Sequence, residues 1–420
     1  MGSGGMAVFQ MRSGPSGVRV RLTSLAALAA FAAVLSVALS WEGSRPASGT
    51  SLEPKPSLTR HVPDYQKGPH VTADAAVLMD ARTGTVLFGK NEQQRRAPAS
   101  TTKILTAVLA LERARLTDEV TIAPSAAYVG GSQIYLRPGE KMTVEELLKG
   151  LMLRSGNDAA VALAEHVSGS ERAFADLMTR RARELGALSS TFRNPNGLPA
   201  AGHYTTAYDL AMITRRGLEL PDFRRIVRSR EDVINWRGEG WDRQLMNTNR
   251  LLWSFHGADG VKTGTTSEAG QCLVASATRG QWQLISVVLH SDDRWSDSVR
   301  LLDWGFANFK VEMPVVRGQE IARAPVVGGV PGEIPLLAGE SLPVVVRNPS
   351  GSALPRLETR YALDARPLTA PLAAGERVGR VWVMVDGEVT AKTDLFAGSS
   401  VQHRGRWWRV LGGRGVTGVE

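Results

Sequence analysis

The sequence contains very little cysteine and histidine, and this scarcity argues against two classes of protein. Cys272 is the one cysteine, so the chain has no internal disulfide framework. It stands in the apolar run Cys272-Leu273-Val274-Ala275, which indicates a small buried thiol rather than a nucleophile. The seven histidines never fall at metal-ligand spacing, so we expect neither a metal nor a cofactor, and a zinc peptidase is disfavoured.

Blocks of basic residues interleaved with aromatic residues are also missing. The chain has 50 Lys and Arg against 41 Asp and Glu, a net charge of +9 that is only a mild excess. We therefore expect no nucleic-acid partner. The same bias is typical of a protein that faces an anionic membrane surface or cell wall.

Long hydrophobic runs are absent apart from one, at residues 25–39. Arg12, Arg19 and Arg21 precede it, and no acidic residue occurs before Glu42. This pattern predicts a signal peptide or signal anchor over residues 1–41. Whether it is cleaved or retained stays open, but both alternatives place the rest of the chain outside the cytoplasm, in a periplasmic or other extracytoplasmic position.

Composition divides the remaining chain. Near Met313 helical periodicity disappears and Pro and Gly become frequent. The expected parts are a linker at 42–69, a catalytic domain at 70–311, a small β-sandwich at 312–397 and a basic tail at 398–420. The tail carries Trp407 and Trp408, which fit either an interfacial membrane anchor or a last strand with packed tryptophans.

Local patterns within residues 70–311 predict an α+β fold. Two apolar runs around Gly84 indicate a β-hairpin over residues 75–90, and further strands are expected at 273–277 and 284–289. Between them, helical spacing follows Pro98, Thr143 begins a capping box, and helices are expected at 158–167 and 170–185. The early and late strands should therefore form one antiparallel sheet, with a helical lobe inserted between them.

Ser100-Thr101-Thr102-Lys103 stands where a helix begins. Because three residues make nearly one helical turn, Ser100 and Lys103 share a face and can touch. A serine needs a base to become a nucleophile, and lysine is a base only if its pKa is lowered by burial or by another cation. Alone, this tetrad more often marks an N-cap serine with a solvated lysine.

Two further motifs follow in order. Ser155-Gly156-Asn157 lies between two predicted helices, where Ser155 can relay a proton and Asn157 can bind a substrate carbonyl. Lys262-Thr263-Gly264 opens an extended segment that can pair with a peptide substrate. There Lys262 is the second cation, and with Thr263 it can hold a terminal carboxylate. Gly264 leaves room for the ligand, and the N–H groups of Ser100 and Thr265 can form an oxyanion hole.

Together these three motifs resemble the signatures of low-molecular-mass, type-5 penicillin-binding proteins, which are serine D-alanyl-D-alanine carboxypeptidases. Asn194-Pro195-Asn196-Gly197-Leu198, Gly202-His203-Tyr204-Thr205-Thr206-Ala207 and Asn247-Thr248-Asn249 are similar to family stretches outside the motifs. The resemblance covers about residues 70–310 and implies the fold shared by penicillin-binding proteins and β-lactamases. It also implies that β-lactams acylate Ser100.

The sequence thus predicts an enzyme that removes the terminal D-alanine from peptidoglycan pentapeptide stems through a Ser100 acyl-enzyme. Ser-Gly-Asn replaces Ser-Asp-Asn in the middle motif, which moves the interpretation away from class A β-lactamases. Three alternatives stay open: a β-lactamase or an endopeptidase on the same fold, and a non-catalytic wall-binding or β-lactam-sensing protein. The resemblance leaves peripheral membrane contact open, because the tail is shorter and less regular than the family's anchor.

Overall fold

The computed structural model describes residues 62, 64–236, 238–348 and 355–405. The predicted signal segment at 1–41, most of the predicted linker, and Trp407 and Trp408 of the tail lie outside the described residues. None of the described helices is long and apolar enough to cross a membrane.

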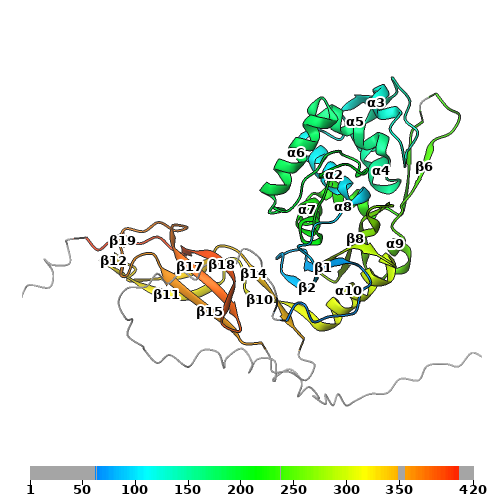
Figure 1. Cartoon of the computed structure of the whole chain (residues 1–420). Helices are drawn as coiled ribbons and strands as arrows, with labels where there is room; N and C mark the ends of the chain where they lie inside the picture. Colours follow the sequence, from blue (N-terminus) through cyan, green and yellow to red (C-terminus); the bar gives the residue numbers. More distant parts are fainter. Residues whose placement is uncertain (1–61, 63, 237, 349–354, 406–420) are drawn as a thin grey trace, which may run out of the picture. The chain divides into compact units, whose positions relative to one another are not determined.

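An antiparallel sheet of five strands forms the base of the larger part of the molecule (Figure 1). Its order is β2-β1-β9-β8-β7, and every neighbouring pair is antiparallel. Because β9 pairs with β1, strands from the two ends of this part lie side by side, as the sequence predicted. The strands are β1 (Ala75–Asp80), β2 (Val86–Lys90), β7 (Ala258–Thr266), β8 (Gly270–Arg279) and β9 (Trp282–Ser291).

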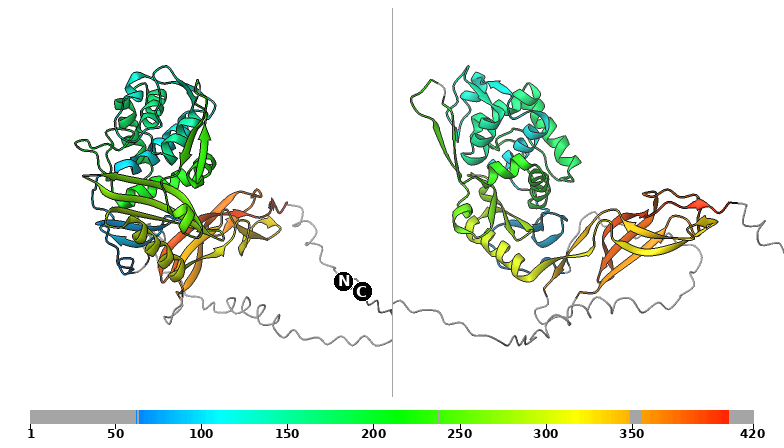
Figure 2. Two further views of the ribbon diagram at one scale, coloured as in Figure 1. Left: turned by 90° about the vertical axis from the view of Figure 1, so that its right-hand side faces the viewer. Right: turned by 180° about the vertical axis from the view of Figure 1, so that it is seen from behind.

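Both faces of this sheet are covered, as the alternation of side chains along β1 requires. Val77 and Met79 pack into the core of the helical lobe, whereas Ala76 and Leu78 pack into a second core. This second core includes Leu301 and Leu302 of α10 (Arg294–Asn308), which covers the opposite face of the sheet (Figure 2). The predicted hairpin is confirmed, and its turn residue Gly84 has a φ of 74°.

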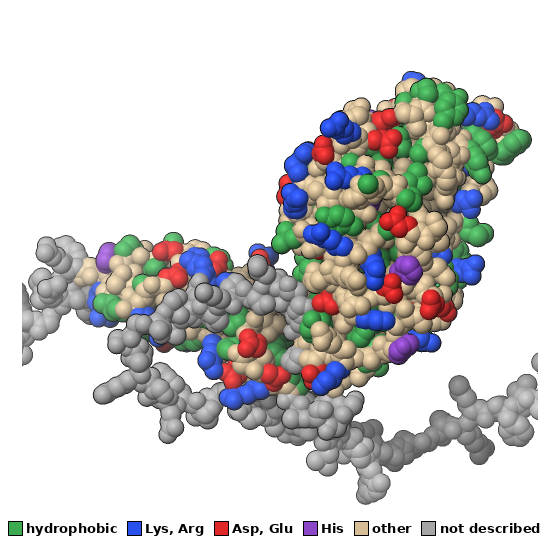
Figure 3. Space-filling view, viewed as in Figure 1, with side chains coloured by type: hydrophobic (Ala, Val, Ile, Leu, Met, Phe, Trp, Pro, Cys, Tyr) green, Lys and Arg blue, Asp and Glu red, His purple; other side chains and the backbone are tan. Residues whose placement is uncertain are grey.

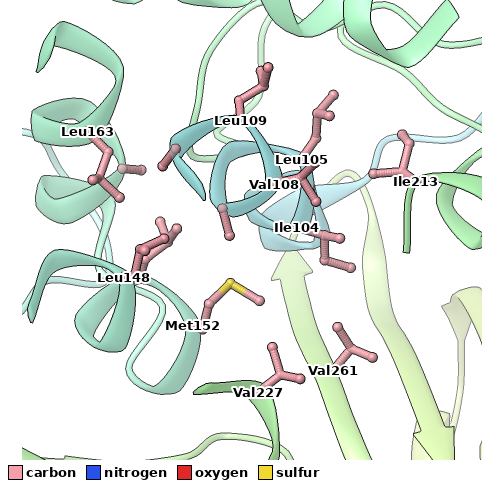
Figure 4. Close-up of a cluster of buried hydrophobic side chains, with 14 of the residues drawn as sticks. Ile104, Leu105, Val108, Leu109, Leu148, Met152, Leu163, Ile213, Val227 and Val261 are labelled. Carbon is pink, nitrogen blue, oxygen red and sulfur yellow. The ribbon is translucent and has the colours of Figure 1, made fainter. Parts of the chain in front are cut away.

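The helical lobe is built around α2 (Lys103–Arg113), whose first eight residues are all buried. Figure 4 shows its side chains, such as Ile104 and Leu109, surrounded by apolar residues of α4, α5, α7, α8 and β7. The other elements of the lobe are β3 (Glu119–Thr121), α3 (Pro124–Ala127), β4 (Lys141–Thr143), α4 (Val144–Leu153), α5 (Asn157–Ser168), α6 (Glu171–Glu184), α7 (Ala207–Glu219), α8 (Pro221–Arg228), β5 (Glu231–Ile234), β6 (Arg243–Met246) and α9 (Leu251–Ser254).

Capping residues begin and end these helices where the sequence predicted. The Thr143 hydroxyl accepts from the Glu146 N–H at 3.2 Å, and the Glu146 carboxylate accepts from the Thr143 N–H at 2.8 Å. The Ser170 side chain caps α6, and Gly186, with a φ of 85°, follows its end. The capping box at Thr143 fixes where α4 begins. The loop that follows α4 then enters the site.

Residues after α10 are rich in strands. Val344 of β14 (Leu342–Arg347) and Val381 of β17 (Arg377–Val385) share one buried cluster, and Asp386-Gly387 stands between β17 and β18 (Glu388–Ala397) as their hairpin turn. Strand β10 begins at Phe309 and crosses the expected boundary at 311–312. The strands are β10 (Phe309–Val315), β11 (Glu320–Val327), β12 (Gly329–Val330), β13 (Glu333–Ala338), β14 (Leu342–Arg347), β15 (Leu357–Leu363), β16 (Leu368–Thr369), β17 (Arg377–Val385), β18 (Glu388–Ala397) and β19 (Gln402–His403).

Replacing the capping threonine tests how far α4 depends on its first turn. Thr143→Ala removes the acceptor for the Glu146 N–H and should lower the free energy of unfolding by about 1 kcal/mol in chemical denaturation. Thr143→Ser keeps a hydroxyl at the cap and is the matched control. Equal stability of the alanine and serine variants would contradict this account.

Candidate active site

The three motifs predicted from the sequence meet beside β7, at the edge of the sheet. Ser100 lies in a short 3-10 turn, η1 (Ala99–Thr102), which leads into α2. The backbone of Gly264 passes so close that a Cβ there would lie 3.0 Å from the Ser100 nitrogen. Since β7 pairs only with β8 among the described strands, its other side is available to an extended ligand.

The turn that presents Ser100 has an unusual backbone. Ala99 has a positive φ of 48°, and the Thr101 hydroxyl donates to the Pro98 carbonyl at 2.6 Å. Gly197 also packs against this turn, and a Cβ on Gly197 would lie 1.9 Å from the Ala99 oxygen. Close contacts of Gly197 and Gly264 therefore fix the position of Ser100.

Lys103 is fully buried and makes three polar contacts. Its Nζ lies 3.0 Å from Ser100 Oγ, 2.7 Å from Asn157 Oδ1 and 2.6 Å from the Asn196 carbonyl oxygen. Burial lowers its pKa well below the usual value, and the positive charge of Lys262 lowers it further, while Asp158 opposes the shift. The predicted pairing of a serine with a buried lysine and a second cation is present in the structure.

The middle motif connects α4 to α5. Ser155 is 7% exposed and adopts a positive φ of 64°, and Asn157 is the first residue of α5. The Asn157 amide donates to the Gly130 carbonyl at 2.6 Å, so both of its polar atoms are engaged within the protein. Asn157 thus orients Lys103, a role that the sequence did not suggest.

Asp158 holds the loop that faces this motif. Its buried carboxylate accepts hydrogen bonds from the backbone N–H groups of Ile134 and Leu136 at 3.0 and 3.1 Å. Burial raises the pKa of this carboxyl, and the backbone hydrogen bonds oppose that shift. Because the same loop supplies the Gly130 carbonyl, Asp158 indirectly positions Asn157.

Strand β7 contributes the third motif. Lys262 is 1% exposed, and burial together with nearby Arg294 lowers its pKa to about 7. Its Nζ donates to the Thr263 carbonyl at 3.0 Å. The Thr263 hydroxyl lies 2.7 Å from that of Thr248, so the two hydroxyls form a polar pair beside β7.

Several contributors to the site were missed at the level of sequence. Arg294 donates to the Gly264 carbonyl at 2.8 Å and to the Thr265 hydroxyl at 2.7 Å, and no motif surrounds it that could have found it. Thr248 and Asn196 lie in stretches that resembled the family, which was the available signal, although neither was assigned to the site.

Metal-ligating groups do not gather anywhere in the described part of the chain: it contains no cluster of three His, Cys, Asp or Glu that could hold a metal ion. Cys272 is buried, as predicted, and burial raises the pKa of its thiol to about 11.

Comparison with known proteins assigns both parts of the chain. The family model described as D-alanyl-D-alanine carboxypeptidase, peptidase S11, matches residues 62–293, and the model for the C-terminal domain of penicillin-binding protein 5 matches residues 309–403.

Individual relatives agree with these matches. The chain is 37% identical to D-alanyl-D-alanine carboxypeptidase DacF of Bacillus subtilis over 79% of this chain and 87% of the relative. It is also 37% identical to D-alanyl-D-alanine carboxypeptidase DacC of Escherichia coli, over 82% and 88% respectively. Among solved structures, penicillin-binding protein 5 from Haemophilus influenzae is similar with a TM-score of 0.68 and 34% identity, covering 80% of this chain and 99% of that one.

Gly197→Ala should displace the Ser100 turn, since the new methyl group would overlap the Ala99 carbonyl. Misplacement by about 1 Å can lower a rate by up to about 100-fold, so we expect acylation by a fluorescent penicillin to slow by tenfold or more. Gly139→Ala is the matched control, because Gly139 also has a positive φ, of 80°, but a Cβ there meets nothing within 4 Å. Equal acylation rates in the two variants would contradict this role for Gly197.

Proposed function

The chain belongs to the peptidase S11 family of D-alanyl-D-alanine carboxypeptidases, and we propose that it removes the terminal D-alanine of peptidoglycan pentapeptide stems through an acyl-enzyme on Ser100. It is a serine carboxypeptidase of the type of penicillin-binding protein 5. The residue roles that follow are part of the proposal.

One observation supports these roles: the three groups around Lys103 Nζ match the two donors and one lone pair of a neutral amine. A neutral amine has two N–H donors and one lone pair. The two acceptors, Asn157 Oδ1 and the Asn196 carbonyl, take the two protons, and the lone pair then faces the Ser100 hydroxyl at 3.0 Å. The lowered pKa of Lys103 supports the same protonation state. Lys103 is therefore the general base.

Acylation couples the attack of Ser100 on the substrate to the loss of its hydroxyl proton. Ser100 Oγ attacks the carbonyl carbon of the penultimate D-alanine while its proton passes to Lys103 Nζ. The N–H groups of Ser100 and Thr265 stabilise the resulting oxyanion, a contribution of about 3–4 kcal/mol for each donor. Collapse breaks the peptide bond, and the proton reaches the leaving amine through the Ser155 hydroxyl, which leaves an ester on Ser100.

The terminal carboxylate of the substrate is held from β7. Lys262 supplies a positive charge, and the hydroxyls of Thr263 and Thr248 supply hydrogen bonds. Gly264 leaves space for the peptide backbone to pair with the strand. In deacylation Lys103 again acts as the base: neutral Lys103 takes a proton from water, whose oxygen attacks the ester carbon. The bond to Ser100 Oγ then breaks, the proton passes from Lys103 to that oxygen, and the shortened stem leaves. β-Lactams enter the same path and form a long-lived ester on Ser100.

Two further assignments belong to the proposal. The apolar run at 25–39, behind its arginines, supports export and action on the outer side of the cytoplasmic membrane. We assign catalysis to residues 70–311 and keep residues 312–397 as a separate β domain, with no catalytic role.

Ser100→Ala removes the nucleophile and should abolish covalent labelling by a fluorescent penicillin and the release of D-alanine from a stem pentapeptide. The measurement is in-gel fluorescence together with an assay for free D-alanine. Peptide mapping of the labelled wild-type protein should find the label at Ser100. A label that persists on the alanine variant would overturn the assignment.

The charge of Lys262 should set the pH at which acylation begins. As pH falls through the lowered pKa of Lys103, the base gains a proton and acylation slows. Lys262→Gln removes a cation that lowers this pKa, so the acid limb of the acylation rate should move to higher pH.

The rate of acylation by a β-lactam, measured across a range of pH, checks this direction. Lys262→Arg keeps the charge and serves as the control, with an acid limb near that of the wild type. An acid limb that stays in place, or moves to lower pH, in the glutamine variant would contradict the electrostatic coupling.

A further inference from the structure

A groove leads away from Ser100 along the side of the catalytic part. An open cavity of about 600 Å³ and a narrow passage of about 10 Å³ share the walls made by Ala97, Pro199, Ala200, His203 and Glu268. The passage reaches Ala99, Gly197 and Thr266, beside the nucleophile turn and the end of β7. The cavity extends outward to Arg95 and Arg96.

The direction of β7 determines which part of a substrate enters this groove, and this step rests on the proposed function. The strand runs from Ala258 to Thr266, and the terminal carboxylate is assigned to Lys262 and Thr263. A peptide that pairs antiparallel to β7 therefore extends its N-terminal part past Thr266 toward Glu268. At about 3.3 Å per residue, the residues before D-Ala-D-Ala extend past Thr266 to the cavity that Glu268 lines.

Two exposed arginine side chains lie at this cavity, Arg95 in its wall and Arg193 beside it. Arg95 is exposed and stacks on the Tyr204 ring, with its guanidinium 4.5 Å from the ring centroid. Arg193, also exposed, lies against Gly202, where a Cβ would be 3.2 Å from its Nη2. Arg95 lines the cavity, whereas Arg193 stands beside the lining residue Gly202. Among the ion pairs of the described residues neither arginine takes part, although the charge of Arg95 opposes the rise that burial causes in the pKa of Asp209.

Besides Arg95 and Tyr204, the titratable groups that line the cavity are Arg96, His203 and Glu268, of which one is acidic. Arg96 is paired with Asp74 at 3.2 Å, yet its buried Nε has no hydrogen-bond partner among the described atoms. His203 is neutral, because burial, and after it the charge of Arg193, lowers its pKa to about 4. Glu268 is the acidic side chain of the cavity wall, and it stands at the inner end, shared with the passage.

We propose that this cavity is a subsite for a carboxylate on the acyl side of the substrate, bound by Arg95 and Arg193. The ligand is a peptide that ends in D-Ala-D-Ala. One of its peptide residues lies beside Thr266, and an acidic residue precedes that one in the peptide. Arg95 is held in place by its stacking on Tyr204, which lowers the entropy cost of binding a carboxylate.

Two peptides of identical sequence test the subsite, one with the upstream carboxylate and one with a carboxamide in its place. The wild-type protein should hydrolyse the acidic peptide with a kcat/KM roughly five- to tenfold higher at low ionic strength, and added salt should reduce this ratio. The double variant Arg95→Gln/Arg193→Gln should bring the ratio of the two kcat/KM values, acidic peptide over carboxamide peptide, close to one. Glu268→Gln should raise this ratio.

Arg172→Gln is the matched control, because Arg172 is an exposed arginine on α6, a helix that contributes no residue to the cavity wall. The acid-to-amide ratio in this variant should equal that of the wild type. A wild-type ratio of one, or a ratio that survives loss of both Arg95 and Arg193, overturns the subsite.

Binding of the same peptides to Ser100→Ala separates this inference from the proposed function, because binding needs no catalysis. Tighter binding of the acidic peptide, measured by fluorescence polarisation, supports the subsite even if the wild type releases no D-alanine. Release of D-alanine with equal affinity for both peptides overturns the subsite alone.

Discussion

The structure depends above all on the burial of Lys103 between two acceptors. Burial of this amine, with Lys262 nearby, lowers the pKa of Lys103 and so favours the neutral form that the proposed mechanism needs beside Ser100. The two acceptors, Asn157 Oδ1 and the Asn196 carbonyl, come from α5 and from the loop before α7, so distant segments must be in place before the lysine can act. The packing of α2 in the helical core supplies the burial (Figure 4).

Further contacts hold Ser100, Lys103 and their neighbours in place. Asp158 holds the loop that holds Asn157, Gly197 closes against the Ser100 turn, and Arg294 ties β7 through the Gly264 carbonyl. Each contact joins two elements rather than residues of one element. Basic and acidic side chains are interspersed on the visible face of the catalytic part (Figure 3), so neither sign of charge dominates that face.

Local sequence rules predicted the elements well, because their causes are local. The Gly84 turn, the Thr143 capping box and the proximity of Ser100 to Lys103 each depend on residues a few positions apart. The Asn196 carbonyl and Arg294 were missed for the opposite reason. A backbone carbonyl has no side-chain signature, and Arg294 reaches Gly264 only because α10 begins beside β7 in the folded sheet. The second role of Asn157 was hidden in the same way.

Ala99 and Ser155, one on each side of the site, adopt left-handed backbone conformations without being glycine. Such a conformation costs a residue with a side chain about 1–3 kcal/mol, which the surrounding fold must offset. Selection for thermal robustness alone would favour glycine at both places, yet glycine would loosen the turn and, at Ser155, delete the hydroxyl. The strained backbone at Ala99 and Ser155 thus lowers stability beside the proposed nucleophile and base, and substitutions meant to raise heat tolerance should be made elsewhere.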